Sequence, residues 1–261
     1  MSINVEAIAE TLIAARDAGQ PVKELVAPGT QGSIADAVRV QQEVVRRTVA
    51  RGDKIVGFKL GNIAKAMQTK FGVDQPDFGP LQHSLFLPEN LRVPASSFIA
   101  PFVELEPAFV LKRDLGGAHV TVADVISATD YVLPSLEIID SRVKDWKITI
   151  FETLCDGGST GAVILGAQPR KLSELNLSDM NGEILYDGEQ VAEGNTAAIY
   201  GNPVAAIAWL CRRVAEFGVD FKAGDVILPG SCLAAVALEP DRRVTGRFAG
   251  WGDVSFDYTA E

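Results

Sequence analysis

Two glutamates stand two residues apart in a stretch that otherwise has the composition of a buried strand. The stretch is FVELEPAFVL, residues 102–111, and it carries Glu104 and Glu106 among aromatic, β-branched and aliphatic residues. Side chains alternate across a strand, so both carboxylates are expected on one face. A core strand would carry apolar side chains at these positions. The pair therefore indicates either a functional site or a solvated sheet face.

A second strand-like stretch, LPSLEIIDSR (residues 133–142), shows the same anomaly. Its apolar residues face one way and Glu137 faces the other. Three carboxylates from two strands would repel one another in a half-buried site, and a divalent cation removes that repulsion. Oxygen ligands favour Mg²⁺, Mn²⁺ or Ca²⁺ over zinc. We therefore hypothesise a cation site at Glu104, Glu106 and Glu137, with a solvated sheet face as the alternative.

A lysine in a third strand-like stretch, KIVGFKLG (residues 54–61), is the next candidate. Lys59 lies on the face opposite the apolar residues, between Gly57 and Gly61. Glycine inside a strand often marks the close approach of a ligand or of another backbone. A lysine between two such gaps could bind a carboxylate or transfer protons. The alternative is an edge-strand lysine that limits aggregation.

Charge and composition exclude several classes of partner. The net charge of −10 disfavours nucleic acid, which binds basic surfaces. The N-terminal MSINVEAIAE lacks the features of a signal peptide, and no apolar run approaches the ~18 residues of a membrane span. The three cysteines are far apart and fit a reducing compartment. We predict a cytoplasmic protein that contacts neither nucleic acid nor membrane.

The first fifty residues have the periodicity of helices. Apolar residues at helical spacing predict a helix from Val5 that ends at Gly19. Ser33 and Asp36 predict a capping box at the start of a second helix, which ends before Gly52.

From residue 54 onward, short β stretches alternate with glycine and proline. Two more helices are predicted, one over Thr121–Tyr131 and one from Asn202 to about Gly218. The last β stretches are DVILPG, CLAAVALEP, RVTGRFAG and DVSFDY. We predict an α+β chain with an N-terminal helical extension, residues 1–53, and a mostly β catalytic domain, residues 54–261.

The sequence GGSTG at residues 157–161 formally matches the nucleophile elbow of α/β-hydrolases. In those enzymes the catalytic histidine follows the serine, whereas His83 and His119 both precede Ser159. We interpret the segment as a flexible loop whose hydroxyl and amide groups bind an anion.

Six stretches together carry a family resemblance. They are VGFKLGNIAKAMQTKFGVDQPDFGPL, VELEPAFVL, LEIIDSRVKDWKI, CDGGSTGAVILG, GNPVAAIAWL and AGDVILPGSCLAAVAL, in this order. The set resembles the 2-hydroxypentadienoate (2-keto-4-pentenoate) hydratases and 4-oxalocrotonate decarboxylases of the fumarylacetoacetate hydrolase superfamily. The likeness runs from about Val5 to the C-terminus. It implies a mixed β-roll of the fumarylacetoacetate hydrolase C-terminal-domain type, preceded by a helical part.

The resemblance also implies roles for individual residues. The metal carboxylates of the family fall on Glu104, Glu106 and Glu137, and the metal is Mg²⁺ or Mn²⁺. Its catalytic lysine falls on Lys59 and the acid of its PDFG motif on Asp77. Its loop serine falls on Ser159, which we expect to bind substrate together with Gly57 and Gly61.

The implied activity is that of a metal-dependent hydro-lyase in the meta-cleavage catabolism of aromatic compounds. Such an enzyme adds water to a 2-hydroxy-2,4-dienoate and gives a 4-hydroxy-2-oxoalkanoate. A 4-oxalocrotonate-type decarboxylase is the main alternative, followed by an acylpyruvate hydrolase and a non-catalytic partner of a decarboxylase. We also expect a homo-oligomer, and a complex with a pathway decarboxylase or aldolase stays open.

Two segments depart from the family pattern. The loop that commonly contains ADNAS reads CDGGS here, so Gly157 replaces an asparagine. After the lysine strand GLTS is usual, whereas this chain has GNIA, with Asn62, Ile63 and Ala64. Both segments border the expected pocket, so they bear on which substrate the chain accepts.

Overall fold

The computed structural model describes residues 3–63, 68–69, 73 and 75–261, and Ala64 lies outside them. Both N-terminal helices are confirmed. Helix α1 (Val5–Ala18) ends at Gly19, which adopts the left-handed conformation with φ of 61°. Helix α2 (Ile34–Ala50) begins with the predicted capping box, in which Ser33 and Asp36 each satisfy a backbone amide of the other.

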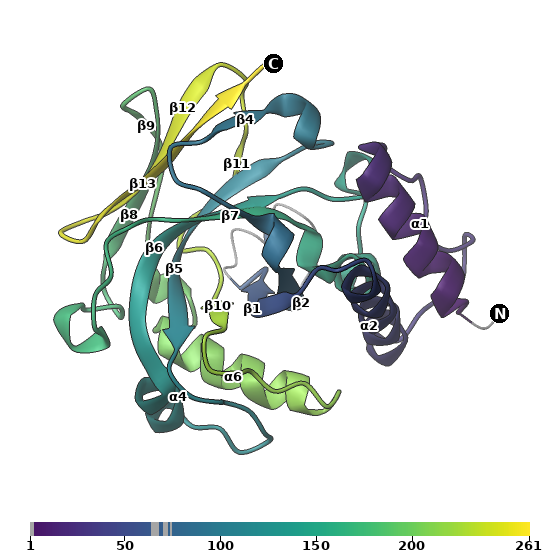
Figure 1. Ribbon diagram of the computed structural model, residues 1–261, viewed down its shortest axis with the longest axis horizontal. Helices are drawn as coiled ribbons and strands as arrows, with labels where there is room; N and C mark the ends of the chain where they lie inside the picture. The colour runs from purple at the N-terminus through teal and green to yellow at the C-terminus, as the bar shows by residue number, and fades with distance from the viewer. Residues whose placement is uncertain (1–2, 64–67, 70–72, 74) are drawn as a thin grey trace.

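Two sheets form most of the remaining chain (Figure 1). The strand order of the eight-stranded sheet is β2-β1-β10-β5-β6-β7-β3, with β11 paired to β5. Its strands are β1 (Ile55–Gly61), β2 (Asp77–Gln82), β3 (Phe86–Leu87), β5 (Phe102–Leu111), β6 (Thr129–Ile139), β7 (Thr160–Leu165), β10 (Val226–Leu228) and β11 (Val236–Ala237). Because β1 runs parallel to β10 while β5 runs antiparallel to β6, the sheet is mixed, as predicted.

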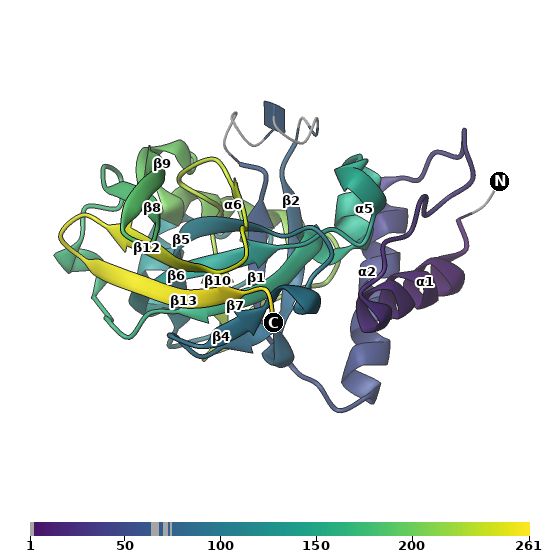
Figure 2. The same cartoon turned by 90° about the horizontal axis from the view of Figure 1, so that it is seen from above.

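The second sheet has five strands in the order β4-β13-β12-β8-β9. They are β4 (Arg92–Pro94), β8 (Asn181–Tyr186), β9 (Glu189–Asn195), β12 (Arg242–Phe248) and β13 (Gly252–Thr259). Within the described residues, three further α-helices with given bounds pack around the sheets, namely α4 (Val122–Ala128), α5 (Ile150–Cys155) and α6 (Pro203–Ala215). Figure 2 shows α1 and α2 together at one flank of the strands, with α5 beside them.

Two sequence-based boundaries are wrong. The helix predicted over Thr121–Tyr131 ends at Ala128, because Thr129 and the residues after it pair with β5 as the start of β6. Tertiary pairing of β-branched and aromatic residues overrides the helical pattern here. In the predicted strand CLAAVALEP, only Val236–Ala237 pairs with the sheet, at the end of β5.

The helical flank and the sheets share one hydrophobic core. Leu12 and Val38 of the two helices belong to the same buried cluster as Leu105 and Leu136 of β5 and β6. No helix among the described residues is long and apolar enough to cross a membrane.

Candidate active site

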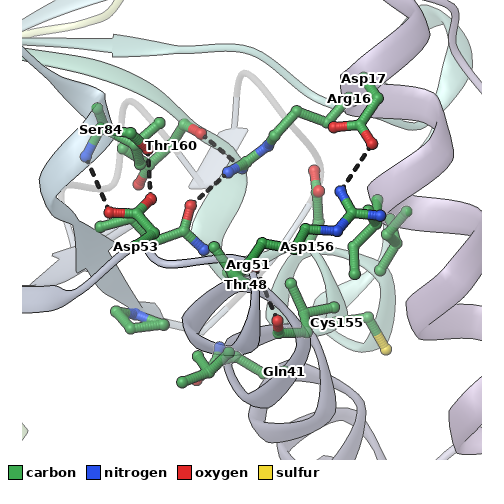
Figure 3. Close-up of a pocket in the computed structure, with 18 residues that line it drawn as sticks. Arg16, Asp17, Gln41, Thr48, Arg51, Asp53, Ser84, Cys155, Asp156 and Thr160 are labelled. Carbon is green, nitrogen blue, oxygen red and sulfur yellow. Dashed lines mark hydrogen bonds and ion pairs between the residues drawn. The ribbon is translucent and has the colours of Figure 1, made fainter.

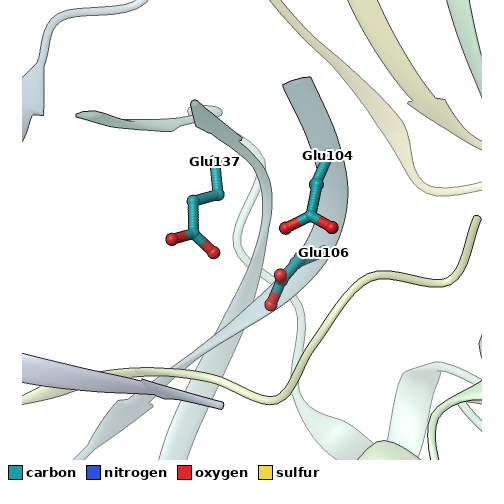
Figure 4. A group of neighbouring side chains, drawn as sticks. All are labelled: Glu104, Glu106 and Glu137. Carbon is teal, nitrogen blue, oxygen red and sulfur yellow. The ribbon is translucent and has the colours of Figure 1, made fainter. Parts of the chain in front are cut away.

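The three glutamates meet on one face of the β5–β6 pair. Glu104 lies directly opposite Glu137 in the strand register, and Glu106 follows two residues later on the same face. Their exposed fractions are 3%, 0% and 0%, and one oxygen of each lies within 4.8 Å of the others (Figure 4). The alternative of a solvated sheet face is therefore wrong.

The oxygens of this cluster fit a divalent cation. One oxygen of Glu106 accepts a hydrogen bond from the Gly230 amide at 2.8 Å, and one of Glu137 accepts from the Thr160 hydroxyl at 2.8 Å. Their other oxygens, Glu106 Oε1 and Glu137 Oε2, are buried without a hydrogen-bond partner in the described part of the chain. Buried polar atoms normally have partners, so these two oxygens are available to a cation.

Burial and mutual repulsion oppose ionisation of the cluster. Burial, together with the charges of Glu137 and Glu104, raises the pKa of Glu106 well above its ordinary value. Burial also raises the pKa of Glu137, although Lys59 and the Thr160 hydroxyl act in the opposite direction. A divalent cation would reverse both effects, because it favours the ionised form of each carboxylate.

Lys59 is the cation that the described chain brings to this cluster. Its side chain is 2% exposed, and β1 lies between β2 and β10, so the edge-strand interpretation is wrong. Its Nζ lies 3.4 Å from Asp77 Oδ1 and 3.7 Å from Glu137 Oε1. Burial alone would lower the pKa of Lys59, but Asp77 and Glu137 raise it above its ordinary value. The neighbouring carboxylates therefore favour the charged form of Lys59.

Asp77 faces Lys59 from the first position of β2, where it pairs with Gly61 of β1. Its Oδ2 accepts a hydrogen bond from the Thr153 hydroxyl at 2.9 Å. Its Oδ1 is buried and accepts no hydrogen bond within the described residues, although the Lys59 ammonium is near. One carboxylate oxygen is thus fixed by the protein while the other has capacity for a further donor.

Two glycines make room for the Lys59–Asp77 pair. A Cβ at Gly61 would lie 2.5 Å from Asp77 Oδ1 and 2.6 Å from Lys59 Nζ, and one at Gly158 would lie 2.8 Å from the same Nζ. Gly57 makes room for a different neighbour, because a Cβ there would collide with the Val226 carbonyl of β10. The structure thus brings Gly61 to the site and places Gly57 against the sheet backbone.

The GGSTG segment is a buried turn, so the prediction of a flexible loop is wrong. The turn Gly157–Ser159 is followed directly by β7, and Ser159 is 1% exposed with φ of 59°. The Ser159 hydroxyl donates to Asp156 at 3.0 Å, and the Arg142 guanidinium pairs with the same carboxylate at 2.6 Å. A buried ion pair therefore fixes the turn.

A small cavity of about 20 Å³ is bordered by Lys59, Asp77 and Glu104, whereas Glu106 and Glu137 do not line it. Its lining combines polar side chains with apolar ones, and consists of Lys59, Asn62, Val73, Asp77, Glu104, Ile139, Trp146, Ile148, Thr153, Gly158 and Ser159. Ordinary ligand pockets have volumes of about 300 Å³ or more. A ligand of ordinary size therefore requires part of this lining to move when it binds.

A larger cavity, of about 260 Å³, lies on the other side of the turn, between the N-terminal helices and β2 (Figure 3). There Arg16 donates to Gln82 at 2.8 Å and to the Thr160 carbonyl at 3.1 Å, while Arg51 pairs with Asp17 at 2.8 Å. None of the three glutamates lines it, and neither does Lys59. We assign the chemistry to the smaller cavity.

Several supporting residues were not identified from the sequence. Thr153 orients Asp77, Thr160 holds Glu137, and the Arg142–Asp156 pair fixes the serine turn. Asp156 lies inside the quoted loop motif and Arg142 inside LEIIDSR. For Arg142 and Asp156, the only sign in the sequence is a charged residue close to a candidate site residue along the chain. No local pattern marks the threonines.

Comparison with known proteins places this geometry in a family. No protein-family model matches the chain. It is 36% identical over 258 residues to a 2-keto-4-pentenoate hydratase of Burkholderia vietnamiensis, covering 98% of both chains. The structure of 4-oxalocrotonate decarboxylase from Pseudomonas putida G7, complexed with magnesium and adipate, superposes with a TM-score of 0.92 at 34% identity and covers 97% of both chains.

A more distant structure shows how far the fold extends. Fumarylpyruvate hydrolase from Pseudomonas aeruginosa, in complex with Mn²⁺ and pyruvate, superposes with a TM-score of 0.59 at 15% identity over 78% of this chain and 89% of its own. This likeness concerns the fold alone. The two relatives of 34–36% identity cover nearly the whole chain, so the chain belongs to the 2-keto-4-pentenoate hydratase and 4-oxalocrotonate decarboxylase family.

Proposed function

We propose that the chain is a metal-dependent hydratase that converts 2-hydroxypenta-2,4-dienoate, or a close homologue, into a 4-hydroxy-2-oxoalkanoate. The observation that carries this proposal is the Asp77 carboxylate beside Lys59 in the small cavity, with one oxygen open to a further donor. Water addition needs a proton acceptor away from the metal carboxylates, and Asp77 supplies one.

Glu104, Glu106 and Glu137 would hold Mg²⁺ or Mn²⁺, and the two unpartnered glutamate oxygens support this assignment. A cation bound there would supply Lewis-acid chemistry that stabilises negative charge developing on the substrate. The relatives named above were solved with magnesium and with Mn²⁺.

The protein's own groups then account for the proton transfers. The Lys59 ammonium donates a proton to C5 of the dienol, and the resulting amine takes the proton that the 2-hydroxyl loses, which yields the 2-oxo-3-enoate and restores the ammonium. Asp77 next accepts a proton from the water whose oxygen bonds to C4. The C3=C4 π electrons shift toward C2 and place negative charge on the 2-oxygen, and protonated Asp77 then returns its proton to C3, which restores both the ketone and the Asp77 carboxylate. We assign Ser159 to the substrate carboxylate, since it lines the same cavity.

Decarboxylation of a 2-oxo-3-enedioate is the second candidate, because a decarboxylase with magnesium superposes on the whole chain. That reaction also passes through an enolate, but it needs no water at C4. Asp77 would then have no substrate proton to accept. Hydrolysis of an acylpyruvate and a role as the non-catalytic partner of a decarboxylase are weaker alternatives. We also propose that the chain forms a homo-oligomer. A complex with a pathway decarboxylase or aldolase is part of the same proposal.

One experiment separates the two lyase activities. With Mg²⁺ and 2-hydroxypenta-2,4-dienoate, the protein should form 4-hydroxy-2-oxopentanoate, identified by chromatography, and Lys59→Ala should lower kcat by about 10²-fold or more. Metal affinity of this variant should change little, as measured by calorimetric titration. If the dienoate is untouched and 2-oxohex-3-enedioate releases CO₂ instead, the chain is a decarboxylase.

A further inference from the structure

Asn62 lines the same cavity as Asp77, and its side-chain oxygen has no hydrogen-bond partner among the described residues. Its side-chain amide donates to the Val73 carbonyl at 2.6 Å and to the Gln75 carbonyl at 2.8 Å. Asn62 is 9% exposed, and its Oδ1 is buried with no hydrogen-bond partner among the described residues. A buried acceptor without a donor carries a free-energy cost. Such an atom in a folded protein therefore indicates a place where a ligand or a water molecule binds.

The orientation of this amide is determined by its neighbours. If the amide were turned over, its oxygen would face two carbonyl oxygens, which is repulsive. The nitrogen must therefore face Val73 and Gln75, and the oxygen must face away from them. The backbone of Asn62 is left-handed, with φ of 57°, a conformation that asparagine adopts more readily than most residues.

The cavity that Asn62 lines has the size and polarity of a water site. Its volume of about 20 Å³ exceeds the roughly 10–15 Å³ that one water needs, and a buried water needs two to four polar partners. Asn62 Oδ1 and Asp77 Oδ1 are both acceptors without a hydrogen-bond donor among the described residues. A water molecule has two hydrogens to donate, one for each.

We infer that Asn62 and Asp77 together hold the water that attacks C4, and that Asn62 is a catalytic residue. This inference rests on the proposed hydratase function. One water hydrogen is held by Asn62 Oδ1 and stays on the oxygen as it bonds to C4. The other passes to Asp77 Oδ1. Asn62 accepts no proton, so its contribution is to orient the water.

The test compares a step that needs water with one that does not. Hydration of 2-hydroxypenta-2,4-dienoate is measured as formation of 4-hydroxy-2-oxopentanoate. Enolisation is measured as exchange of the C3 hydrogens of 2-oxopentanoate for deuterium in D₂O, followed by NMR. Both assays use the full chain with Mg²⁺. Asn62→Leu removes the acceptor but strains the left-handed backbone, so Asn62→Gly, which tolerates that backbone, is measured beside it.

Gln41→Leu is the matched control. The Gln41 amide also donates to two buried carbonyls, those of Phe78 and Leu154, but Gln41 does not line the small cavity. Both Asn62 variants should lower the ratio of hydration to exchange by about tenfold or more, and Gln41→Leu should leave that ratio unchanged.

The possible outcomes distinguish a failure of this inference from a failure of the proposed hydratase function. An unchanged ratio in both Asn62 variants, including one produced by equal loss of both activities, would show that Asn62 serves only to bind the Val73 and Gln75 carbonyls. A fall in the ratio for Gln41→Leu of the same size would overturn the inference too. If the unmodified protein enolises 2-oxopentanoate but never hydrates the dienoate, the hydratase proposal itself fails.

Discussion

At the level of single residues, one buried ammonium faces four buried carboxylates. Lys59 lies within ion-pair distance of Asp77 and Glu137, while Glu104 and Glu106 complete the cluster. Removing a charge from a repulsive cluster stabilises a protein, whereas removing a metal ligand weakens metal binding. The same substitution should therefore have opposite effects on the stability of the metal-free protein and on catalysis.

Glu106→Gln tests this directly. The Gln side chain can still accept from Gly230, and its amide nitrogen can donate to the neighbouring carboxylates. We expect the melting temperature of the metal-free protein to rise by a few degrees and Mg²⁺-dependent activity to be lost. Because the pKa of Glu106 is raised in the folded state, the gain should grow as pH rises and vanish in acid, where Glu106 is already neutral.

The measurement combines calorimetric melting across pH with Mg²⁺ titration. Glu189→Gln, an exposed strand glutamate, serves as the control and should change neither quantity. A Glu106→Gln protein that binds Mg²⁺ as well as the unmodified one would remove Glu106 from the metal site.

The residue scale also shows what the sequence could predict. The three glutamates were recognisable because strand periodicity is local, and a charge on an apolar face stands out. Thr153 and the Arg142–Asp156 pair were not, since their role depends on contacts between distant segments. Asn62 was visible only as a departure from the family pattern, and its unpartnered oxygen required the structure.

At the level of elements, β1 and β2 position the acid–base pair because the glycines of β1 let neighbours approach. A Cβ at Gly61 would meet the movable ends of Asp77 and Lys59, whereas a Cβ at Gly57 would meet the rigid backbone of β10. Caps and turns of helices were predictable from short motifs, as Ser33 and Asp36 show. The boundary between α4 and β6 was not, because pairing with β5 decides it.

Gly61→Ala and Gly57→Ala should therefore fail in different ways. Gly61→Ala should lower kcat by about tenfold to a hundredfold through displacement of the Lys59–Asp77 pair, with little change in melting temperature. Gly57→Ala should lower the stability by about 1–3 kcal/mol or more, because the strand must shift away from Val226. Thermal melting and steady-state kinetics on both variants check this. Full activity of Gly61→Ala would show that the pair tolerates displacement.

At the scale of the whole molecule, the N-terminal helices belong energetically to the sheets. Helices α1 and α2 contribute fully buried apolar residues to the common core, including Leu12 and Val38. The Gln41 amide of α2 donates to the carbonyls of Phe78 in β2 and Leu154 in α5, which links the helical part to the rest of the chain. The division of the chain at residue 53 described a change in secondary structure, and it stays a prediction as a division into domains.

A chain that begins at residue 54 tests that division. Fully burying one large apolar side chain contributes about 1.5–3 kcal/mol to the free energy of unfolding. Losing several of them therefore removes a large part of the roughly 5–15 kcal/mol by which a typical domain is stable. We expect the shortened chain to lack a cooperative melting transition and to bind no Mg²⁺. Gln41→Leu in the full chain should melt at a lower temperature but retain the metal site, since two carbonyls lose their donors while the core stays covered. A shortened chain that melts cooperatively and binds Mg²⁺ as tightly as the full one would establish residues 54–261 as an independent domain. The residues that line the small cavity all lie after residue 53, so such a chain would keep the complete lining without the N-terminal helices.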